Sequence, residues 1–287
     1  MLKDFSMSKF YPMETYYKVL SIAGSDCSGG AGIQADLKTC SALGVYCMTA
    51  ITAITAQNTV RISGIENISS DMVGQQIDAI YADIIPDSIK IGMLPTEEII
   101  KTVASQLIAH NANGIILDPV MISTSGYKLI SDNAIDALVT KLIPIVDLIT
   151  PNRHEAELLT GHSITDINDI VNAGQEIIDL GAKAVLIKGG HFDDEAMTDY
   201  LFVNKSSEPI GFRSKKINST NTHGTGCSYS SAIASYFAMG CDLYTSISKA
   251  KEYITNAIAE GSNVTIGHGH GSVNHSFNPV KLIKHQL

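Results

Sequence analysis

The sequence predicts an α/β protein built on a mostly parallel sheet that carries helices on both faces. Apolar segments of strand length, rich in Ile, Val and Thr, alternate along the chain with segments whose apolar residues recur at helical spacing. Hydrophobic residues make up 45% of the 287-residue chain and charged residues 17%, which suits a large core on both sides of such a sheet.

The segments predicted as strands are short, apolar and bounded by turn residues. They cover residues 17–24, 46–54, 88–92, 114–120, 146–150 and 183–190. Residues 60–68 are expected to form a further extended pair or an edge strand, and residues 199–218 a β-hairpin that turns around 206–208. The turns that follow these strands hold the Gly-rich and charged segments, so ligands are expected at the carboxyl ends of the strands.

The segments predicted as helices carry apolar residues every three or four positions, as in Ile33, Leu37 and Cys40. A serine at the start of 70–84 is expected to cap that helix, and Gly181 to end another. The predicted helices cover residues 32–44, 70–84, 96–110, 131–143, 167–181, about 224–239 and 242–260.

Composition excludes several classes of protein. The net charge of −9 and the absence of a Lys- or Arg-rich block argue against nucleic acid as a partner. Five cysteines without a C-x-x-C pair suit a reducing cytoplasm rather than a disulfide framework. The first 20 residues lack the apolar core of a signal peptide, and no apolar run reaches 18 residues, so neither a signal peptide nor a membrane span is expected. We expect residues 1–16 to be a loose extension and residues 17–287 to form one domain.

The segment 221–228, NTHGTGCS, is the most informative motif. Gly224 and Gly226 precede a predicted helix, where unpaired N–H groups carry partial positive charge and can hold a phosphate or oxyanion. Cys227 falls in the first turn, where the same field is expected to favour thiolate. A tight helix entry with a small buried cysteine, a phosphoryl-transfer site and a cysteine nucleophile all fit this local pattern.

Two other nucleotide-binding patterns are not supported. The chain lacks G-x-x-x-x-G-K-[ST], which excludes a Walker-type site. GAGIQA at residues 30–35 matches the loose dinucleotide pattern G-x-G-x-x-A, but residues 50–58 lack the acidic residue that this pattern requires at the next strand end.

Several motifs, taken in order, carry a resemblance to a known family. They are SIAGSDCSGGAGIQADLKT (21–39), TAITAQNT (52–59), KIGML (90–94), LDPVM (117–121), TPNRHEAELLTG (150–161), IKGGH (187–191) and NTHGTGCS (221–228). With the tail TIGHGHGSVNHSF, the chain resembles the hydroxymethylpyrimidine/phosphomethylpyrimidine kinases of thiamine biosynthesis, in the ribokinase-like superfamily, from about residue 17 to about 278. The resemblance implies a three-layer α/β/α fold with a central, mostly parallel sheet. It also implies two ATP-dependent transfers in one site, to an aminopyrimidine alcohol and then to its monophosphate.

The resemblance assigns the phosphoryl site to Gly224, Thr225, Gly226 and Cys227. The cysteine stands where most ribokinase-like enzymes place a catalytic aspartate, and it would take or orient the proton of the substrate hydroxyl. Because an alcohol is far less acidic than a thiol, proton transfer is expected late, and Cys227 is expected mainly to position the hydroxyl.

The resemblance also assigns residues to Mg²⁺ and ATP. Asn152 and Glu155 form an N-x-x-E motif, which in the family binds Mg²⁺, often through water molecules. On local sequence alone, the alternative is that they cap a helix. Asp118 is a second candidate near metal or phosphate, or simply a turn residue before Pro119. Lys188 is assigned to bind the ATP phosphates; its alternative is a solvent-exposed surface lysine. Thr222 and His223 are assigned to line the path by which the nucleotide enters.

The pyrimidine is assigned to Gln57, Asp36, Ala31, Gly24 and Met93. Gln57 lies where the family presents Glu or Gln to the aminopyrimidine edge, and an amide both donates and accepts hydrogen bonds. Ala31 and Met93 have core packing as their alternative, and Asp36 could be an exposed residue of helix 32–44. The tail histidines, His268 and His270, are weak evidence for metal, and a loop that closes near the nucleotide is the preferred interpretation.

Three other functions compete with this one. Pyridoxal kinase shares the chemistry, and Gln57 favours the aminopyrimidine. A non-catalytic nucleotide-binding regulator is disfavoured by the joint presence of Cys227, Glu155 and Lys188. A cysteine hydrolase would need a histidine base, and His223 is near in sequence but has no evident orienting partner. By analogy with similar enzymes, a homodimer is expected.

Overall fold

The fold is centred on a nine-stranded sheet in the order β10-β9-β8-β7-β6-β5-β2-β3-β4, as seen in a computed structural model that describes residues 13–122, 129–190, 196–203 and 208–286. The central strands, from β3 through β2 to β8, are parallel, and β4, β9 and β10 are antiparallel to their neighbours. The strands are β2 Lys18–Asp26, β3 Tyr46–Gln57, β4 Ile62–Asn67, β5 Ser88–Ile91, β6 Ile115–Leu117, β7 Leu148–Ile149, β8 Ala184–Gly190, β9 Ala196–Val203 and β10 Ile210–Lys215.

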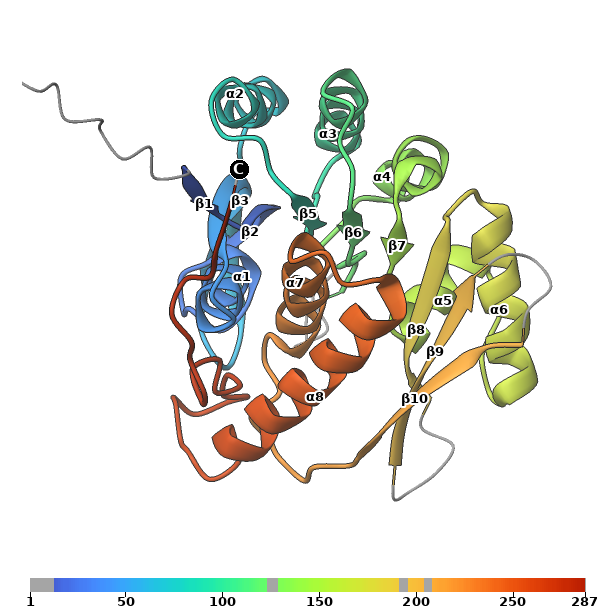
Figure 1. Ribbon diagram of the computed structural model, residues 1–287. Coiled ribbons are helices and arrows are strands. Elements are labelled where there is room, and N and C mark those ends of the chain that lie inside the picture. Colours follow the sequence, from blue (N-terminus) through green and yellow to red (C-terminus); the bar gives the residue numbers. More distant parts are fainter. Residues whose placement is uncertain (1–12, 123–128, 191–195, 204–207, 287) are drawn as a thin grey trace, which may run out of the picture.

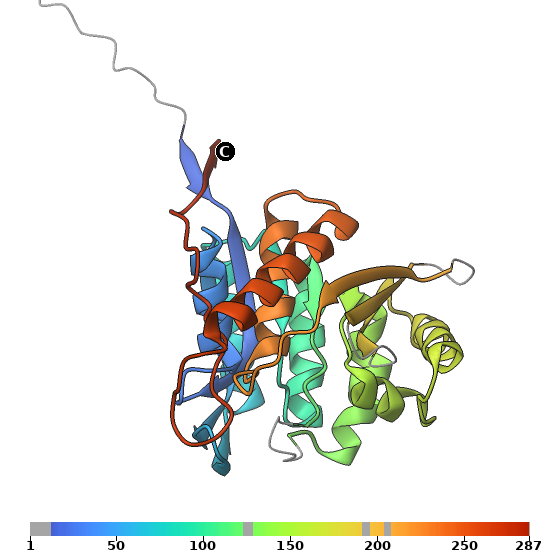
Figure 2. The ribbon, with the colours of Figure 1, turned by 90° about the horizontal axis from the view of Figure 1, so that it is seen from below.

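Helices cover both faces of this sheet (Figures 1 and 2). One face carries α1, α7 and α8, and the other carries α2 to α6. The helices are α1 Gly32–Ala42, α2 Ser70–Tyr81, α3 Glu97–Ala109, α4 Asp132–Ala137, α5 Arg153–Thr160, α6 Ile167–Asp179, α7 Thr225–Ala238 and α8 Leu243–Gly261. The predicted three-layer α/β/α fold is therefore confirmed.

Alternating side chains of the strands fill the two cores. In β6, Ile115 and Leu117 join the core under α3, whereas Ile116 joins the core under α7. Because neighbouring residues of a strand point to opposite faces, a central strand between two helical layers must be apolar at every position. This requirement explains the uninterrupted apolar runs that predict the strands.

Several elements confirm or correct the sequence predictions. β4 lies at the sheet edge and β9 and β10 pair as antiparallel neighbours, as expected; residues 204–207 of the predicted hairpin turn lie outside the described residues. The cap of α2 is Ser69, whose hydroxyl accepts from the Met72 N–H, rather than Ser70. The helix predicted for 131–143 is α-helical only to Ala137 and then widens into a π turn ahead of Pro144, which has no N–H to continue it.

The expectation that residues 1–16 form a loose extension is wrong for residues 14–16. Glu14–Tyr16 forms strand β1, which pairs antiparallel with β11, Lys284–Gln286, in a separate two-stranded sheet. The ring of Tyr17 stacks on His285 beside this pairing, at a centroid distance of 4.3 Å. The partner strand lies some 270 residues further along the chain, so local sequence could not indicate the pairing.

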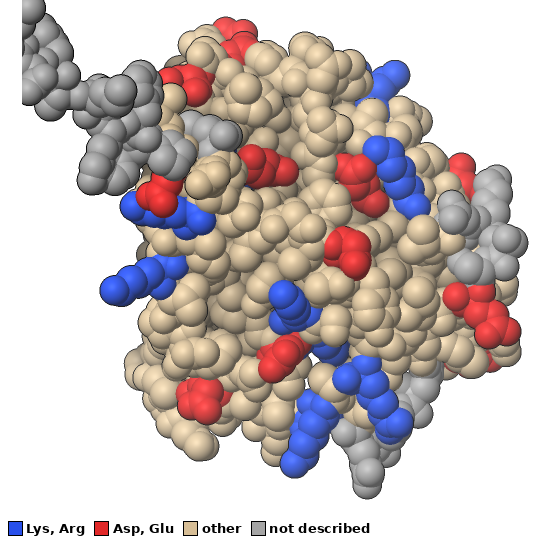
Figure 3. All heavy atoms as spheres, viewed as in Figure 1, with Lys and Arg blue, Asp and Glu red and all other residues tan. Residues whose placement is uncertain are grey.

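The surface carries both signs of charge. Figure 3 shows acidic and basic side chains interspersed on the face that carries α8, without a continuous basic stripe. In the described part of the chain, no helix combines the length and apolarity needed to cross a bilayer.

His275 gives the fold an acid-sensitive position. Its side chain is buried, and its Nε2 has no hydrogen-bond partner among the described residues. Burial, together with electrostatic repulsion from Lys38 and His223, lowers the pKa of His275 to about 4. The unfolded chain therefore binds the proton first as the pH falls, so stability is lost between about pH 6.5 and pH 4.

We expect His275→Gln to reduce this acid sensitivity. Between pH 6.5 and pH 4 the wild-type free energy of unfolding should fall by about 2–3 kcal/mol more than that of the variant. Urea unfolding at several pH values measures both slopes. Parallel curves for the two proteins would show that His275 is not the responsible group.

Candidate active site

A cavity of about 240 Å³ opens at the carboxyl ends of β2, β3 and β6, beside the N-terminus of α7. This is the edge of a parallel sheet at which ligands are expected. The residues that the sequence singles out and that line this cavity are Gly24, Ala31, Gln57, Met93, Asp118, Asn152, Glu155, Lys188, Thr222, His223, Gly224, Thr225, Gly226 and Cys227. Sequence motifs far apart in the chain therefore meet in one place.

A second cavity, of about 610 Å³, adjoins the first. The two share Lys188, Thr225 and Gly226 in their walls, so the start of α7 lies between them. The second cavity is also lined by Tyr229 and by the basic residues Lys215, Lys216 and Lys251. An elongated ligand could therefore lie in one cavity and present one end to the other.

Two glycine loops meet backbone to backbone at the cavity. Gly224 caps α7 with φ +80°, and a Cβ at this position would lie 1.8 Å from the carbonyl oxygen of Gly30. Only glycine fits, because the conformation is left-handed and the neighbour is backbone. The N–H of Thr225 donates to the Thr222 carbonyl, which leaves the amides of Gly226 and Cys227 at the helix start to face an anion.

Gly224→Ala is expected to destabilise the protein by about 1–3 kcal/mol more than Gly240→Ala. Gly240 has almost the same backbone, φ +84°, but nothing lies within 4 Å of its added Cβ. The control therefore carries the left-handed strain alone, and the difference isolates the contact with Gly30. Thermal unfolding of both variants measures it, and equal losses would contradict the close approach.

Cys227 is a half-buried thiol rather than a thiolate, which corrects the expectation drawn from its place in the first turn. Burial raises the pKa of the Cys227 thiol to about 11; Lys90 and a hydrogen bond from the Gly32 N–H act in the opposite direction, and Asp36 and Asp118 add to the rise. The partial charge of the helix end is thus outweighed by desolvation and two carboxylates.

Asp36 lies behind the cavity rather than in its wall. It is fully buried, so the alternative that it is an exposed residue of helix α1 is wrong. Its carboxylate accepts hydrogen bonds from Ser21 at 2.6 Å and Ser231 at 2.7 Å and forms a 2.9 Å ion pair with Lys90. Both charged side chains are 0% exposed. Asp36 of α1 is therefore tied to Ser231 of α7 and to Lys90 of β5, and sequence reasoning missed Lys90 entirely.

Asp118 and Lys188 form an ion pair of 2.6 Å where the two cavities meet. An added Cβ on Gly226 would lie 3.3 Å from Asp118 Oδ2 and 3.5 Å from Lys188 Nζ, so the pair sits directly against the start of α7. Burial alone would lower the pKa of Lys188. The carboxylates of Asp118 and Glu155 outweigh burial, so the pKa of Lys188 is raised. Lys188 is therefore a fixed positive charge beside the anion-binding amides.

Asn152 and Glu155 form a full capping box at the start of α5. The Asn152 side chain accepts from the Glu155 N–H at 3.0 Å, and Glu155 accepts from the Asn152 N–H at 2.8 Å. Asn152 and Glu155 therefore cap α5 and also line the smaller cavity. Burial and the neighbouring Asp118 raise the pKa of Glu155 to about 7, although Lys188 opposes the rise.

These charges fit a hard cation. Two buried carboxylates face one lysine, and Glu155, with a pKa of about 7, stays partly protonated near neutral pH because burial and the neighbouring Asp118 disfavour its charge. Mg²⁺ prefers one or two carboxylates together with water and phosphate oxygens. The described residues contain no cluster of three or more His, Cys, Asp or Glu side chains with metal-site spacing. In the tail loop, the His270 N–H donates to the Thr59 carbonyl, and His270 Nδ1 lies 3.2 Å from the Thr220 carbonyl oxygen.

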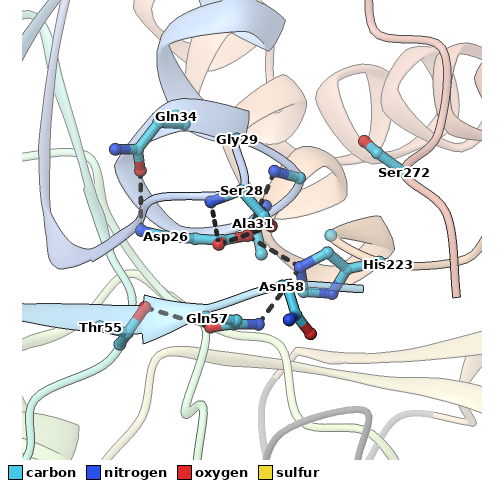
Figure 4. Close-up of polar contacts among 12 residues, drawn as sticks. Asp26, Ser28, Gly29, Ala31, Gln34, Thr55, Gln57, Asn58, His223 and Ser272 are labelled. Atoms are coloured by element: carbon cyan, nitrogen blue, oxygen red, sulfur yellow. Dashed lines mark hydrogen bonds and ion pairs between the residues drawn. The ribbon is translucent and has the colours of Figure 1, made fainter. Parts of the chain in front are cut away.

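Asp26 is a charged cavity residue that the sequence analysis missed. Its carboxylate accepts hydrogen bonds from Ser28, Gly30 and Ala31 and lies 2.8 Å from His223 Nε2 (Figure 4). Burial opposes ionisation, but these hydrogen bonds outweigh it and lower the pKa of Asp26 to about 2. A signal was present, because an aspartate two residues before a serine and just ahead of Gly-Gly is typical of a side chain that caps its own loop.

Asp26 also bears on the hydrolase alternative. It is an orienting partner for His223, but His223 Nε2 is engaged by Asp26 at 2.8 Å and Gln57 at 3.3 Å rather than by the Cys227 sulfur. The pair of Cys227 and His223 therefore does not form the nucleophile and base of a cysteine hydrolase.

The fold and the two joined cavities define a small-molecule kinase, in which a helix N-terminus and a lysine meet between two binding sites. The sequence model of the phosphomethylpyrimidine kinase family matches residues 26–274, and the chain belongs to this family.

Curated relatives support the same family. The chain is 43% identical to the hydroxymethylpyrimidine/phosphomethylpyrimidine kinase of Rhizobium meliloti, over 89% of this chain and 96% of that protein. It is 45% identical to the thiamine biosynthesis bifunctional protein ThiED of Geobacter sulfurreducens, over 90% of this chain, and it spans about half (52%) of that longer relative.

Solved structures agree with the fold. The phosphomethylpyrimidine kinase from Clostridium difficile is 45% identical, with a TM-score of 0.74, over 84% of this chain and 99% of that one. The pyridoxal kinase from Staphylococcus aureus in complex with AMP-PCP and pyridoxal is 31% identical, with a TM-score of 0.83, over 95% of this chain and 100% of that one.

Proposed function

We propose that this kinase phosphorylates 4-amino-5-hydroxymethyl-2-methylpyrimidine and then its monophosphate, with ATP as the donor, in thiamine diphosphate biosynthesis. The observation that carries the proposal is the pair of cavities joined at the start of α7. The smaller cavity, lined by Gln57 and Met93, suits a flat ring with a polar edge, and the larger one suits a nucleotide. The 43% identity to a relative of this name supports the same substrates.

The residues between the cavities would neutralise and align the transferred group. The amides of Gly226 and Cys227 and the ammonium group of Lys188 face the position where phosphoryl oxygens would lie. Phosphoryl transfer depends on such alignment and charge neutralisation more than on covalent help. Asp118 and Glu155 would hold Mg²⁺, which would supply further positive charge to the phosphate oxygens.

Cys227 would position the substrate hydroxyl. With the pKa of its thiol raised to about 11, the sulfur is protonated at neutral pH and does not remove a proton in the resting enzyme. It contacts the hydroxyl from the first turn of α7, next to the amides that hold the phosphoryl group. The hydroxyl oxygen would form the new P–O bond as the bond to ADP breaks. Its proton would leave late, when the oxygen has become acidic, and would pass to an oxygen of the transferred phosphoryl group or to water.

A coupled ADP-release assay tests the proposal. Purified protein is supplied with ATP, Mg²⁺ and, in separate reactions, the pyrimidine alcohol, its monophosphate and pyridoxal. ADP release with both pyrimidines, and a higher kcat/KM for the pyrimidine alcohol than for pyridoxal, is the expected result. Absence of ADP release with all three compounds would favour a non-catalytic nucleotide-binding protein.

Pyridoxal is the second candidate substrate, because the chain overlays the pyridoxal kinase from Staphylococcus aureus over nearly its full length. A higher kcat/KM for pyridoxal would select it. A homodimer and a cytoplasmic location remain predictions, and light scattering of the purified protein tests the first.

A further inference from the structure

The amide of Gln57 is held at both ends across the wall of the smaller cavity. Its Oε1 lies 3.2 Å from Thr55 Oγ1, and its Nε2 lies 3.3 Å from His223 Nε2 (Figure 4). One end of an amide accepts hydrogen bonds and the other donates them, while the two ends have nearly the same shape. The protons on the neighbouring groups therefore decide which end faces which neighbour.

His223 is a donor at the atom that faces Gln57. Its Nε2 lies 2.8 Å from Asp26 Oδ2, and Asp26 is ionised, because four further hydrogen bonds from the loop 28–31 stabilise its charge. An ionised carboxylate only accepts, so Nε2 must carry the proton. A nitrogen that carries a proton cannot accept one from the amide nitrogen of Gln57.

We propose that Asp26, acting through His223, fixes the Gln57 amide with its carbonyl oxygen toward His223 and its NH₂ group toward Thr55. Each contact along the series Asp26, His223, Gln57 and Thr55 then joins a hydrogen-bond donor to an acceptor. His223 Nε2–H is shared between Asp26 and the Gln57 oxygen, and the Gln57 NH₂ donates to Thr55 Oγ1. Thr55 can accept because its own hydroxyl donates to the Ser25 carbonyl at 2.9 Å.

The fixed amide determines how the substrate ring lies, an inference that rests on the proposed function. On the aminopyrimidine, the exocyclic amine donates and the adjacent ring nitrogen accepts, and the hydroxymethyl group lies on the other side of the amine. With its oxygen toward His223, Gln57 draws the amine to that side. The hydroxymethyl group then points toward Gly224, which follows His223 in the chain and begins the anion-binding turn. A reversed amide would bind the ring turned over, with its hydroxymethyl group away from that turn.

A double-mutant cycle tests this positioning role. Asp26→Ala removes the carboxylate that holds the proton on His223 Nε2, so that this nitrogen can accept from the Gln57 amide. Asp26→Asn is unsuitable, because the oxygen that faces His223 also accepts from the Gly30 and Ala31 N–H groups, and an asparagine would keep its carbonyl oxygen there. We expect kcat/KM for the pyrimidine alcohol to fall at least about tenfold when Gln57 is present. In the Gln57→Glu background the same change should cost less than about threefold, because two equivalent oxygens leave no orientation to fix.

Ser28→Ala is the matched control. It removes the 2.7 Å hydrogen bond from the Ser28 hydroxyl to the same carboxylate, on the loop side, and leaves the contact with His223 intact. Its effect should be the same factor in both backgrounds. Circular dichroism and thermal unfolding confirm that each variant is folded before its kinetics are compared.

A substrate analogue whose ring edge has donor and acceptor exchanged gives a second readout, the ratio of kcat/KM for the two compounds. Simple loss of structure would not change this ratio. In the 4-oxo analogue the exocyclic group accepts and the ring nitrogen donates. The ratio of kcat/KM for the amine to that for the oxo compound should fall at least about tenfold in Asp26→Ala. Equal losses in both backgrounds with an unchanged ratio would overturn this inference alone. A wild-type enzyme that is inactive with the pyrimidine alcohol would overturn the proposed function, and this inference with it.

Discussion

Cys227→Ala is expected to lower kcat by about 10²–10⁴-fold while KM for the pyrimidine alcohol changes by less than about threefold. Cys227 lies in the first turn of α7 and lines the smaller cavity. Its removal leaves the ring contacts of Gln57 and Met93 intact but loses the group that holds the hydroxyl in line. Steady-state ADP release at saturating ATP separates kcat from KM.

Cys241→Ala is the control for this variant. Cys241 is a half-buried free cysteine just past the end of α7 and lines neither cavity, so its loss should leave both constants unchanged. The raised pKa of the Cys227 thiol adds an independent check, because its alkylation by iodoacetamide should be slow at pH 7 and accelerate toward pH 10. Wild-type turnover in Cys227→Ala would remove this residue from the mechanism.

Lys90→Met is expected to destabilise the protein by about 3–5 kcal/mol. The lysine and Asp36 have 0% exposed side chains and an ion-pair distance of 2.9 Å. Burial disfavours the charge of Lys90, but Asp36 outweighs this cost and raises the lysine pKa. The variant would leave the buried Asp36 carboxylate without its counter-charge, and two serine hydroxyls would be its remaining hydrogen-bond donors.

A second substitution separates the charge effect from the loss of packing. Lys90→Met combined with Asp36→Asn removes both charges and keeps an acceptor for the two serines, so at least half of the lost stability should return. Lys183→Met, which breaks an exposed ion pair with Asp147, should cost less than about 1 kcal/mol. Urea unfolding measures all of these variants. A small effect of Lys90→Met would show that water reaches this ion pair.

Much of the fold could be predicted because its strands are buried on both faces. The unbroken apolar runs such as 183–190 and the helical spacing between them locate the layers of the sheet. The pairing of β1 with β11 joins segments some 270 residues apart, and no local pattern reports a contact at such separation.

The candidate site was predictable where a motif coincides with a strand end or a helix start, as for Gly224, Lys188 and Glu155. The sequence did not indicate the electrostatics. Cys227 has the position of an activated thiol, yet desolvation and nearby carboxylates keep it protonated. Lys90 lies within an apolar strand, a placement that by itself implies a buried counter-charge. The identity of that partner, Asp36, follows only from the packing of α1 against the sheet.

The small sheet of β1 and β11 has a consequence for protein engineering. It brings residues 14 and 286 into register as neighbours, at one border of the molecule (Figure 1). A short peptide joining these positions would leave all nine strands of the main sheet in place. New ends could then be opened at an exposed turn such as that at Gly240, so the architecture lends itself to circular permutation.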